Sequence, residues 1–122
     1  MLLKLKQINA SKDVLNFLTS QKMSGRLAFT FGRNIKRIYP EINRFQTEWD
    51  ALIMKYGSVI KEKDKPDITK VTPENMDVWM TEAQALSDTE VELNLVMIKS
   101  EDLNQLSLTP LEVETISWMI ED

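Results

Sequence analysis

Two residue types are absent from this chain of 122 residues, which contains no cysteine and no histidine. Without cysteine there is neither a disulfide nor thiolate chemistry, and nothing points to an oxidising compartment. Without histidine the chain lacks the commonest general base and the commonest transition-metal ligand. These two absences remove most of the familiar routes to an enzyme or a zinc site.

Glycine and long hydrophobic runs are also scarce. The three glycines, Gly25, Gly32 and Gly57, form no glycine-rich phosphate loop. No segment approaches the roughly 20 apolar residues that cross a bilayer, so no membrane partner is expected. The stretch 1–6 carries lysines inside its apolar run and no small-residue cleavage site, unlike a signal peptide. We therefore expect a soluble cytoplasmic protein that forms a single domain over residues 1–122.

Carboxylates are plentiful, but their positions do not favour catalysis. General acid–base chemistry needs two carboxylates in different, partly buried environments. The close pairs of this chain all fall where solvent is expected, and its serines have no histidine partner. We therefore predict no enzyme, no catalytic residue, no metal site and no cofactor. The pairs are Glu48 with Asp50, Glu90 with Glu92, Glu101 with Asp102, and Glu112 with Glu114.

The main predicted element is a long amphipathic helix from Gly25 to Tyr56. Its apolar residues recur every three or four positions, and Gly57 stands where a helix C-cap belongs. Pro40 interrupts the middle, which favours a kink or a break. Because the apolar phase continues across Pro40, we favour one bent helix. The alternatives are a full break at Pro40, or a strand over Leu27–Phe31. The stripe comprises Leu27, Phe31, Ile35, Ile38, Ile42, Phe45, Trp49, Leu52 and Tyr56.

An unbroken helix of this length would extend beyond its own domain. At 1.5 Å per residue it would measure about 48 Å. A compact domain of this size is only roughly 35 Å across. Part of the stripe would then need another helix or another subunit to cover it, which favours a homo-oligomer.

The remaining segments predict an α+β fold in which two or three shorter helices and a sheet of two to four strands accompany the long kinked helix. Alternation at Leu3 and Leu5 indicates a short strand, and a brief helix should follow around 14–18. Residues 58–72 form a loose hairpin or an exposed loop. A helix with Met76, Trp79, Met80, Ala83 and Leu86 on its buried face begins near Pro73, and Glu90–Ile98 alternates as the clearest strand.

The last predicted helix, Pro110 to Ile120, begins with a capping box at Thr109 and Glu112. It has two apolar sides, one of which carries Leu111 and Trp118. A terminal helix that must bury two sides often packs against a second molecule. We therefore predict Leu111 and Trp118 as protein-interface residues, with Trp118 as the anchor.

All four arginines of the chain lie in the long helix, at Arg26, Arg33, Arg37 and Arg44. These spacings of seven, four and seven place them within about 20° of one line on a helix. Arginine presents a flat fork of donors suited to phosphates and carboxylates. The segment from Gly25 to Tyr56 carries six basic and three acidic residues in a chain of net charge −4. The line is therefore either a solvated face or a binding surface for an anion or an acidic protein.

Two neighbours extend this candidate anion-binding set. Phe29 lies off the apolar stripe, on the arginine side of the helix and beside Lys36. An exposed aromatic ring next to guanidinium groups can stack a nucleobase. An ordinary contact of Phe29 with the preceding helix is the simpler interpretation. The candidate ligand-binding residues are Arg26, Phe29, Arg33, Lys36, Arg37 and Arg44.

The order of these elements resembles a family of small proteins encoded by tailed bacteriophages and prophages. The resemblance rests on the helix ending at Lys55-Tyr56-Gly57, the strand 91–95 and the leucine-rich tail 106–110. The loop 62–67 departs from the glycine-rich turn of that family. No functional residue can be carried over. The resemblance implies a viral accessory protein in the cytoplasm of a bacterial host, of a kind that works by binding.

The leading prediction is a non-enzymatic protein that binds a host or phage protein and forms a homo-oligomer. The alternative is a binder of an anion, a nucleotide or a nucleic acid through the arginine line. A protein that sequesters a signal nucleotide against host defence would be one version of this alternative.

Overall fold

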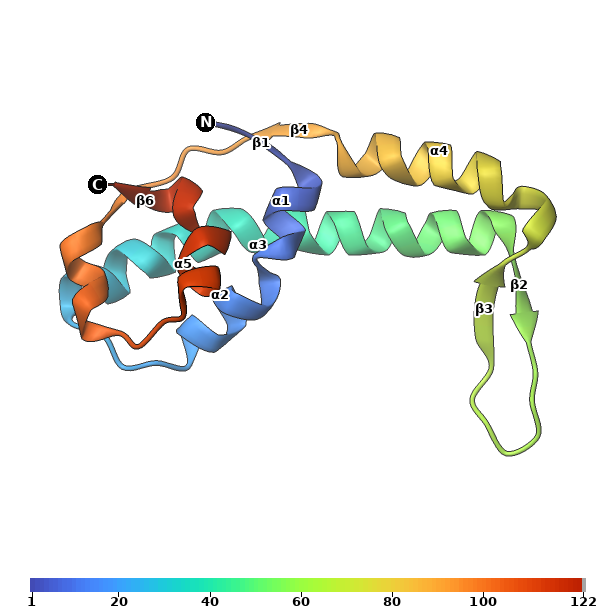
Figure 1. Ribbon diagram of the computed structural model, residues 1–122, viewed down its shortest axis with the longest axis horizontal. Coiled ribbons are helices and arrows are strands. Elements are labelled where there is room, and N and C mark those ends of the chain that lie inside the picture. Colours follow the sequence, from blue (N-terminus) through green and yellow to red (C-terminus); the bar gives the residue numbers. More distant parts are fainter. Residues whose placement is uncertain (122) are drawn as a thin grey trace.

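A computed structural model describes residues 1–121 and shows an elongated α+β molecule built around one long helix (Figure 1). The predicted fold class is confirmed, but the strands form three separate two-stranded sheets. The elements in chain order are β1 (Leu2–Lys4), α1 (Leu5–Ala10), α2 (Lys12–Thr19), α3 (Gly25–Tyr56), β2 (Gly57–Ile60), β3 (Ile68–Val71), the 3₁₀ helix η1 (Pro73–Asn75), α4 (Met76–Ser87), β4 (Glu90–Glu92), β5 (Ile98–Lys99), the 3₁₀ helix η2 (Ser100–Gln105), α5 (Pro110–Thr115), the 3₁₀ helix η3 (Ser117–Met119) and β6 (Ile120–Glu121).

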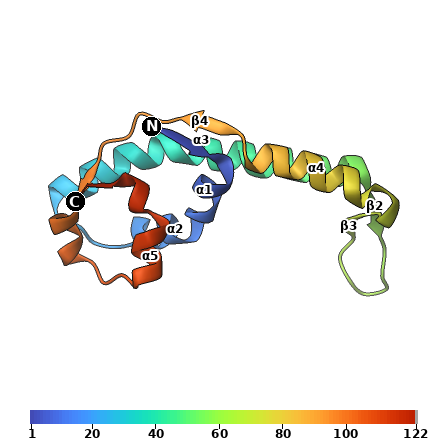
Figure 2. The same ribbon diagram turned by 45° about the horizontal axis from the view of Figure 1, so that its top comes forward.

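The molecule has two regions that share α3. The body, residues 1–45 and 88–121, gathers α1, α2, the C-terminal elements and both ends of the described chain around the first part of α3. The arm, residues 46–87, consists of the rest of α3, the β2–β3 hairpin, η1 and α4. Figures 1 and 2 show the arm projecting to one side, with α4 running back along α3 and the hairpin at its far end.

Helix α3 runs through Pro40 without a break, as predicted. The apolar periodicity continues across the proline, and burial of the stripe outweighs the one backbone hydrogen bond that proline cannot donate. In the body, the chain covers this stripe with its own α1, α2 and C-terminal segments, and Leu27, Phe31, Ile38, Ile42 and Phe45 are buried. A second molecule is therefore not needed to cover this part of the stripe.

The start of α3 is tied to η2. The Ser24 backbone N–H donates to Oε1 of Gln105 at 2.6 Å, and Nε2 of Gln105 donates to Oγ of Ser24 at 3.0 Å. Ser24 is the N-cap residue of α3, but its hydroxyl accepts from Gln105 instead of from a helix N–H. Two residues later, Arg26 pairs with Asp102 of η2. These contacts fix the position of η2 against the body.

Asn34 is a fully buried polar side chain in the middle of the apolar stripe. Its Nδ2 donates to the carbonyl of Val96 at 2.8 Å, and its Oδ1 accepts from the Val96 N–H, also at 2.8 Å. Asn34 therefore bonds Val96 as a neighbouring β-strand would. The predicted strand Glu90–Ile98 is wrong in extent, because only Glu90–Glu92 and Ile98–Lys99 form strands. Between them the chain is held by a side chain instead of a sheet.

Two of the two-stranded sheets, β1–β4 and β5–β6, lie in the body. β1 pairs with β4 in an antiparallel register that sets Leu3 against Val91. β5 pairs with β6 in a parallel register that sets Ile98 against Ile120. The sequence prediction that Leu5 continues the first strand is wrong, because Leu5 begins α1, where its side chain is buried.

The junction between α3 and the hairpin explains Gly57. This residue is the C-cap of α3, as the sequence predicts, and its backbone is extended (φ −109°, ψ 174°) instead of left-handed. A Cβ on residue 57 would lie 2.4 Å from the Ile53 carbonyl oxygen and 2.7 Å from that of Lys70. Glycine is therefore required because two backbones approach closely. The Tyr56 carbonyl accepts from the Thr72 N–H at 3.1 Å, which links the end of α3 to the chain that leads into α4.

Two helices are shorter or less covered than predicted. Helix α5 begins with the predicted Thr109–Glu112 capping box but ends at Thr115 instead of Ile120. Helix α4 buries only Ala83 and Leu86 fully and Trp79 in part. Met76 and Met80, predicted on its buried face, are exposed.

Candidate binding surfaces

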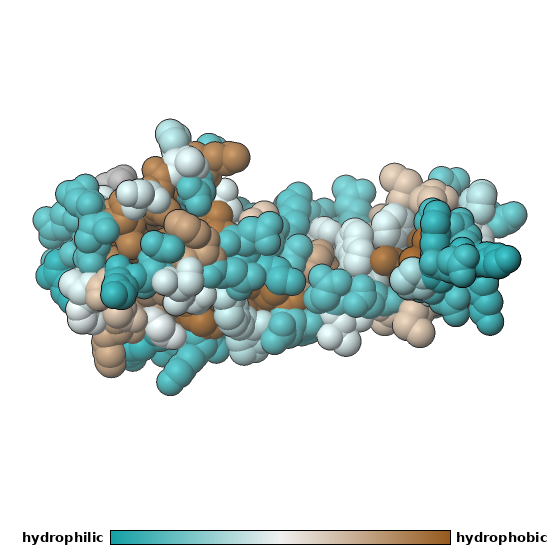
Figure 3. Space-filling model, turned by 90° about the horizontal axis from the view of Figure 1, so that it is seen from below, coloured by the Kyte–Doolittle hydropathy of each residue, from teal (hydrophilic) through white to brown (hydrophobic). Residues whose placement is uncertain are grey.

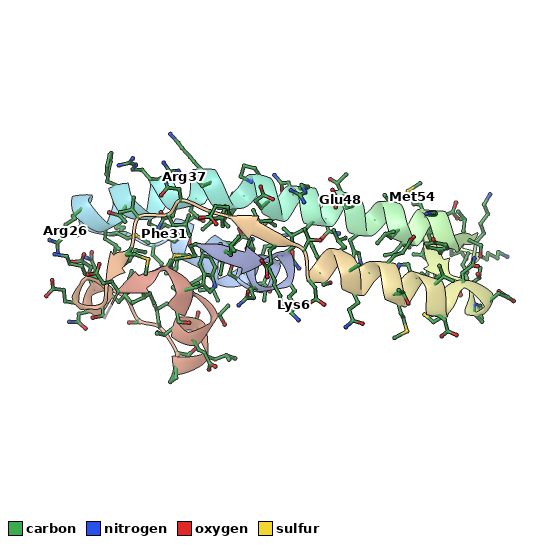
Figure 4. All side chains as sticks on the ribbon, turned by 90° about the horizontal axis from the view of Figure 1, so that it is seen from above. Lys6, Arg26, Phe31, Arg37, Glu48 and Met54 are labelled. Atoms are coloured by element: carbon green, nitrogen blue, oxygen red, sulfur yellow. The ribbon has the colours of Figure 1, made fainter. Side chains whose placement is uncertain are left out.

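The four arginines lie on the one continuous helix α3, and all four are exposed, as the sequence predicts. Their surroundings nevertheless differ along the helix. The outer arginines are engaged by carboxylates of the same chain, whereas the central ones, Arg33 and Arg37, have no such partner among residues 1–121. Figure 4 shows Arg26 at the end of α3 near η2, and Arg37 on the side of α3 that faces away from the other elements.

Arg26 belongs to an intramolecular ion pair. Its guanidinium donates a hydrogen bond to Asp102, and this bond, with the carboxylate charge, raises the pKa of Arg26 above its ordinary value. The pair borders a pocket of about 150 Å³ whose lining includes Leu27, Thr30 and Lys99. Arg26 therefore joins α3 to η2 and is not available as an unpaired donor.

Arg44 is engaged in the same way within α3. Its guanidinium lies 3.3 Å from Glu41 and 3.4 Å from Glu48, at helical spacings of three and four residues. Two carboxylates therefore balance this one cation. The arginine line does not act as four equivalent anion-binding groups.

The central basic residues form a smaller surface, which we call the basic patch: Phe29, Arg33, Lys36 and Arg37. Phe29 is 67% exposed, and the Arg33 guanidinium lies over its ring, 5.6 Å from the centroid. Among residues 1–121, no carboxylate lies within ion-pair distance of Arg33, Lys36 or Arg37. At this exposure most of the Phe29 ring lacks the cover from the preceding helix that the simpler interpretation expected, and it is available to a ligand or a partner.

The predicted interface residues Leu111 and Trp118 do not share one helix face, because α5 ends between them. They still line one open pocket of about 380 Å³, together with Gln7 and Ala10 of α1. Leu111 is 71% exposed, but Trp118 is half buried and its indole N–H donates to the Thr115 carbonyl at 3.0 Å. Leu111 is therefore accessible, whereas Trp118 packs against its own chain.

The arm presents a surface that the sequence does not predict. Over residues 46–82 no side chain is buried. The seam between α3 and α4 consists of Trp49 against Trp79, with ring centroids 5.3 Å apart, and of half-buried Leu52. The Lys55 ammonium lies 3.6 Å from Glu82 across the two helices. Two packed helices thus meet along one narrow line, with solvent on both sides.

Exposed methionines lie beside this seam. Met76 and Met80 are one helical turn apart on α4, and Met80 is 56% exposed. We call these two residues the methionine ledge. Space-filling Figure 3 shows hydrophobic surface on the body and again near the far end of the arm, with mostly hydrophilic surface between them. Two buried polar atoms of the arm, Trp79 Nε1 and Glu82 Oε2, have no hydrogen-bond partner within residues 1–121.

The described residues contain neither a cluster of carboxylates suited to a metal ion nor a helix suited to a membrane. Among residues 1–121 no three aspartate or glutamate side chains are grouped so as to hold a metal ion. The helices within the described part of the chain include none with the length and apolar character that a bilayer crossing requires.

Comparison with known proteins adds no family. No protein-family model, curated protein or solved structure matches the chain. Function must therefore be inferred from the surfaces described above.

Proposed function

We propose that this protein acts without catalysis, as a phage-type accessory protein that binds a host or phage protein through its arm and also self-associates. The observation that carries the proposal is the absence of any buried side chain over residues 46–82. An arm with no core of its own leaves apolar side chains in water, and docking onto another protein would bury them.

The methionine ledge is the part of the arm that best suits a protein partner. Methionine is flexible and polarisable, so it adapts to apolar surfaces of different shapes. On α4, Met76 lies about one turn before Trp79 and Met80 follows it directly, so the Trp49–Trp79 contact would provide a rigid aromatic support near the ledge.

The negative charge around α4 indicates which charged residues the surface of the partner should carry. From Val71 to Ile98 the chain has six acidic residues and no basic one. A surface that docks on α4 would therefore be apolar, with lysine or arginine at its rim. We propose a partner protein with such an apolar, basic-edged groove.

The test compares two substitutions at one exposed position. Met80→Lys places a charge on the ledge, whereas Met80→Leu keeps it apolar. Proteins captured from the host by the wild-type protein are identified, purified and tested for direct binding to both variants. We expect Met80→Leu to bind within about threefold of wild type and Met80→Lys to lose at least about tenfold in affinity.

The contrary result is equally clear. A purified partner that binds both variants equally, without slowing amide exchange in α4, would show that the arm is not the docking element. Phe17→Lys on α2 is the control, because Phe17 is an exposed apolar residue of the body. This substitution should leave partner binding unchanged.

The basic patch supports the second candidate, binding of a nucleotide or a nucleic acid. An exposed ring beside cations without carboxylate partners can stack a base and contact a phosphate. Such binding should weaken steeply as the salt concentration rises, unlike docking of the methionine ledge. Arg33→Glu combined with Arg37→Glu should abolish nucleic-acid binding and leave the Met80-dependent interaction intact.

A further inference from the structure

The outer face of α3, which points away from α4 and the body, is left uncovered along the whole helix. Phe29 lies near one end of this face and Met54 near the other, and these are its two most exposed large apolar residues, at 67% and 72%. They are 25 positions apart, which places them within about 20° of one line on an α-helix. Figure 4 shows Met54 and Arg37 projecting from the same side of α3.

Charge is distributed unequally along this helix. The first half, residues 25–40, has four basic residues and no acidic one. The second half, residues 41–56, has three acidic and two basic residues. Two copies aligned in parallel would oppose their positive halves, whereas an antiparallel pair opposes each positive half to the slightly negative half of its partner.

We infer that the outer face of α3 is a self-complementary surface, on which a second copy of this chain packs antiparallel about a two-fold axis between Glu41 and Ile42. This inference rests on the self-association part of the proposed function but not on the methionine ledge. The two-fold axis is midway between Phe29 and Met54, so each Phe29 ring packs on the Met54 of the other copy.

The same register also brings side chains of opposite charge together. It places Arg33 opposite Asp50, so the exposed cation of the basic patch gains the carboxylate that its own chain does not supply. It also places Pro40 opposite Asn43. The middle of the face carries small and medium side chains at Pro40, Asn43, Thr47 and Ala51, together with the long side chain of Lys36, which lies opposite Thr47 in this register.

The size of the contact predicts its strength. Phe29 and Met54 are about 38 Å apart along the helix, and a helix–helix contact is about 10 Å wide. About 400 Å² would then be buried on each copy, roughly half of what a standard stable interface buries. The dimer should therefore be weak and concentration-dependent, with a dissociation constant in the micromolar range or above.

Sedimentation velocity of the full chain over a wide concentration range tests the inference. The wild-type protein should shift from monomer to dimer without larger species. Arg33→Glu and Asp50→Lys should each weaken the dimer about tenfold or more, because each change creates two repulsive contacts per dimer. The double variant Arg33→Glu/Asp50→Lys exchanges the charges and should restore the dimer to within about threefold of wild type.

A second pair of variants tests the apolar ends of the register. Met54→Ser should weaken the dimer, whereas Leu2→Ser, at a similarly exposed apolar position of β1, should not. Circular dichroism and the unfolding midpoint of each variant establish that it folds, and both substituted side chains are exposed.

Three outcomes would overturn the inference. One is a wild-type protein that stays monomeric at millimolar concentration, and another is a dimer that the double charge exchange fails to restore. The third is a growing series of larger assemblies, which indicates a head-to-tail contact instead of a closed two-fold one. Because the methionine ledge is tested by partner binding to Met80 variants, failure here leaves that proposal intact, and failure there leaves this one intact.

Discussion

The body and the arm are built on the same helix but are stabilised in different ways. In the body the apolar stripe of α3 is enclosed by α1, α2 and the C-terminal segment, and side chains such as Ile38 are completely buried. In the arm the same stripe meets α4 and, at the end of α3, the base of the β2–β3 hairpin. The only buried residues of the arm, Ala83 and Leu86, lie near its base. One amphipathic pattern therefore yields a packed core where several elements surround it, and an open seam where little besides α4 lies beside it.

The largest expected effect comes from making one substitution in both regions. Leu27 is buried in the body, and Leu52 occupies the equivalent line of α3 in the arm but is half buried. Leu27→Ala should lower the free energy of unfolding by about 3 kcal/mol, from lost burial and the remaining cavity. Leu52→Ala should lower it by about 1 kcal/mol. Equal losses in urea unfolding would remove the distinction between body and arm.

Asn34 is a second test that is specific to the body. Asn34→Ala removes both hydrogen bonds to Val96 and leaves a backbone N–H and a carbonyl without partners. We expect a loss of about 2–3 kcal/mol in unfolding free energy. Asn43→Ala, on the exposed side of the same helix, should change it by less than about 0.5 kcal/mol. A neutral Asn34→Ala would show that Val96 is held by other contacts.

Glycine to alanine substitution should have opposite effects at Gly32, inside α3, and at Gly57, directly after its end. Gly57→Ala forces a Cβ against two backbone carbonyl groups at the base of the hairpin, and we expect a loss of about 2 kcal/mol. Gly32→Ala meets no atom within 4 Å inside the helix and should stabilise the protein by about 0.5–1 kcal/mol. Thermal unfolding shows whether each variant is more or less stable than wild type. A destabilising Gly32→Ala would contradict the packing described for α3.

The smallest expected effect concerns Asp88, at the point where the arm rejoins the body. The hydrogen bond and charge of Lys6, with a smaller contribution from Lys4, lower the pKa of Asp88 below its ordinary value. A lowered carboxyl pKa stabilises the fold above the unfolded-state pKa, and this stabilisation is lost as the pH falls through the folded-state pKa. Asp88→Asn should therefore unfold slightly more easily than wild type at pH 6, and the urea midpoints should converge in strong acid. A gap that persists at the lowest pH would show that Asp88 acts through packing instead of charge.

The long helix was predictable because its periodicity is sustained over nine apolar positions, which is enough to outweigh a single proline. The sequence also marks Asn34 as unusual, since this polar residue lies on the apolar line between Phe31 and Ile38. Its hydrogen-bonding partner could not be predicted, because Asn34 and Val96 are 62 positions apart in the sequence. The Arg26–Asp102 ion pair could not be predicted for the same reason, because its residues are 76 positions apart. This pair removes one arginine from the candidate site.

The arm was misjudged for a different reason. The spacing of Met76 and Met80 fits the buried face of an amphipathic helix, but burial depends on how many neighbours surround that helix. With α3 as the one long helix beside α4, only the central line of its apolar face is covered, and the methionines remain in water. Local pattern indicates which residues can be buried, and tertiary arrangement decides which of them are.

Hydrogen–deuterium exchange on the dilute, intact protein is the most direct test of the distinction between the two regions. We predict that amides of α4 exchange at least about a hundredfold faster than those of α3 between Leu27 and Phe45, because the arm opens without disrupting the core. Equal protection of α4 and the body in the free monomer would contradict the conclusion that the arm lacks a core of its own.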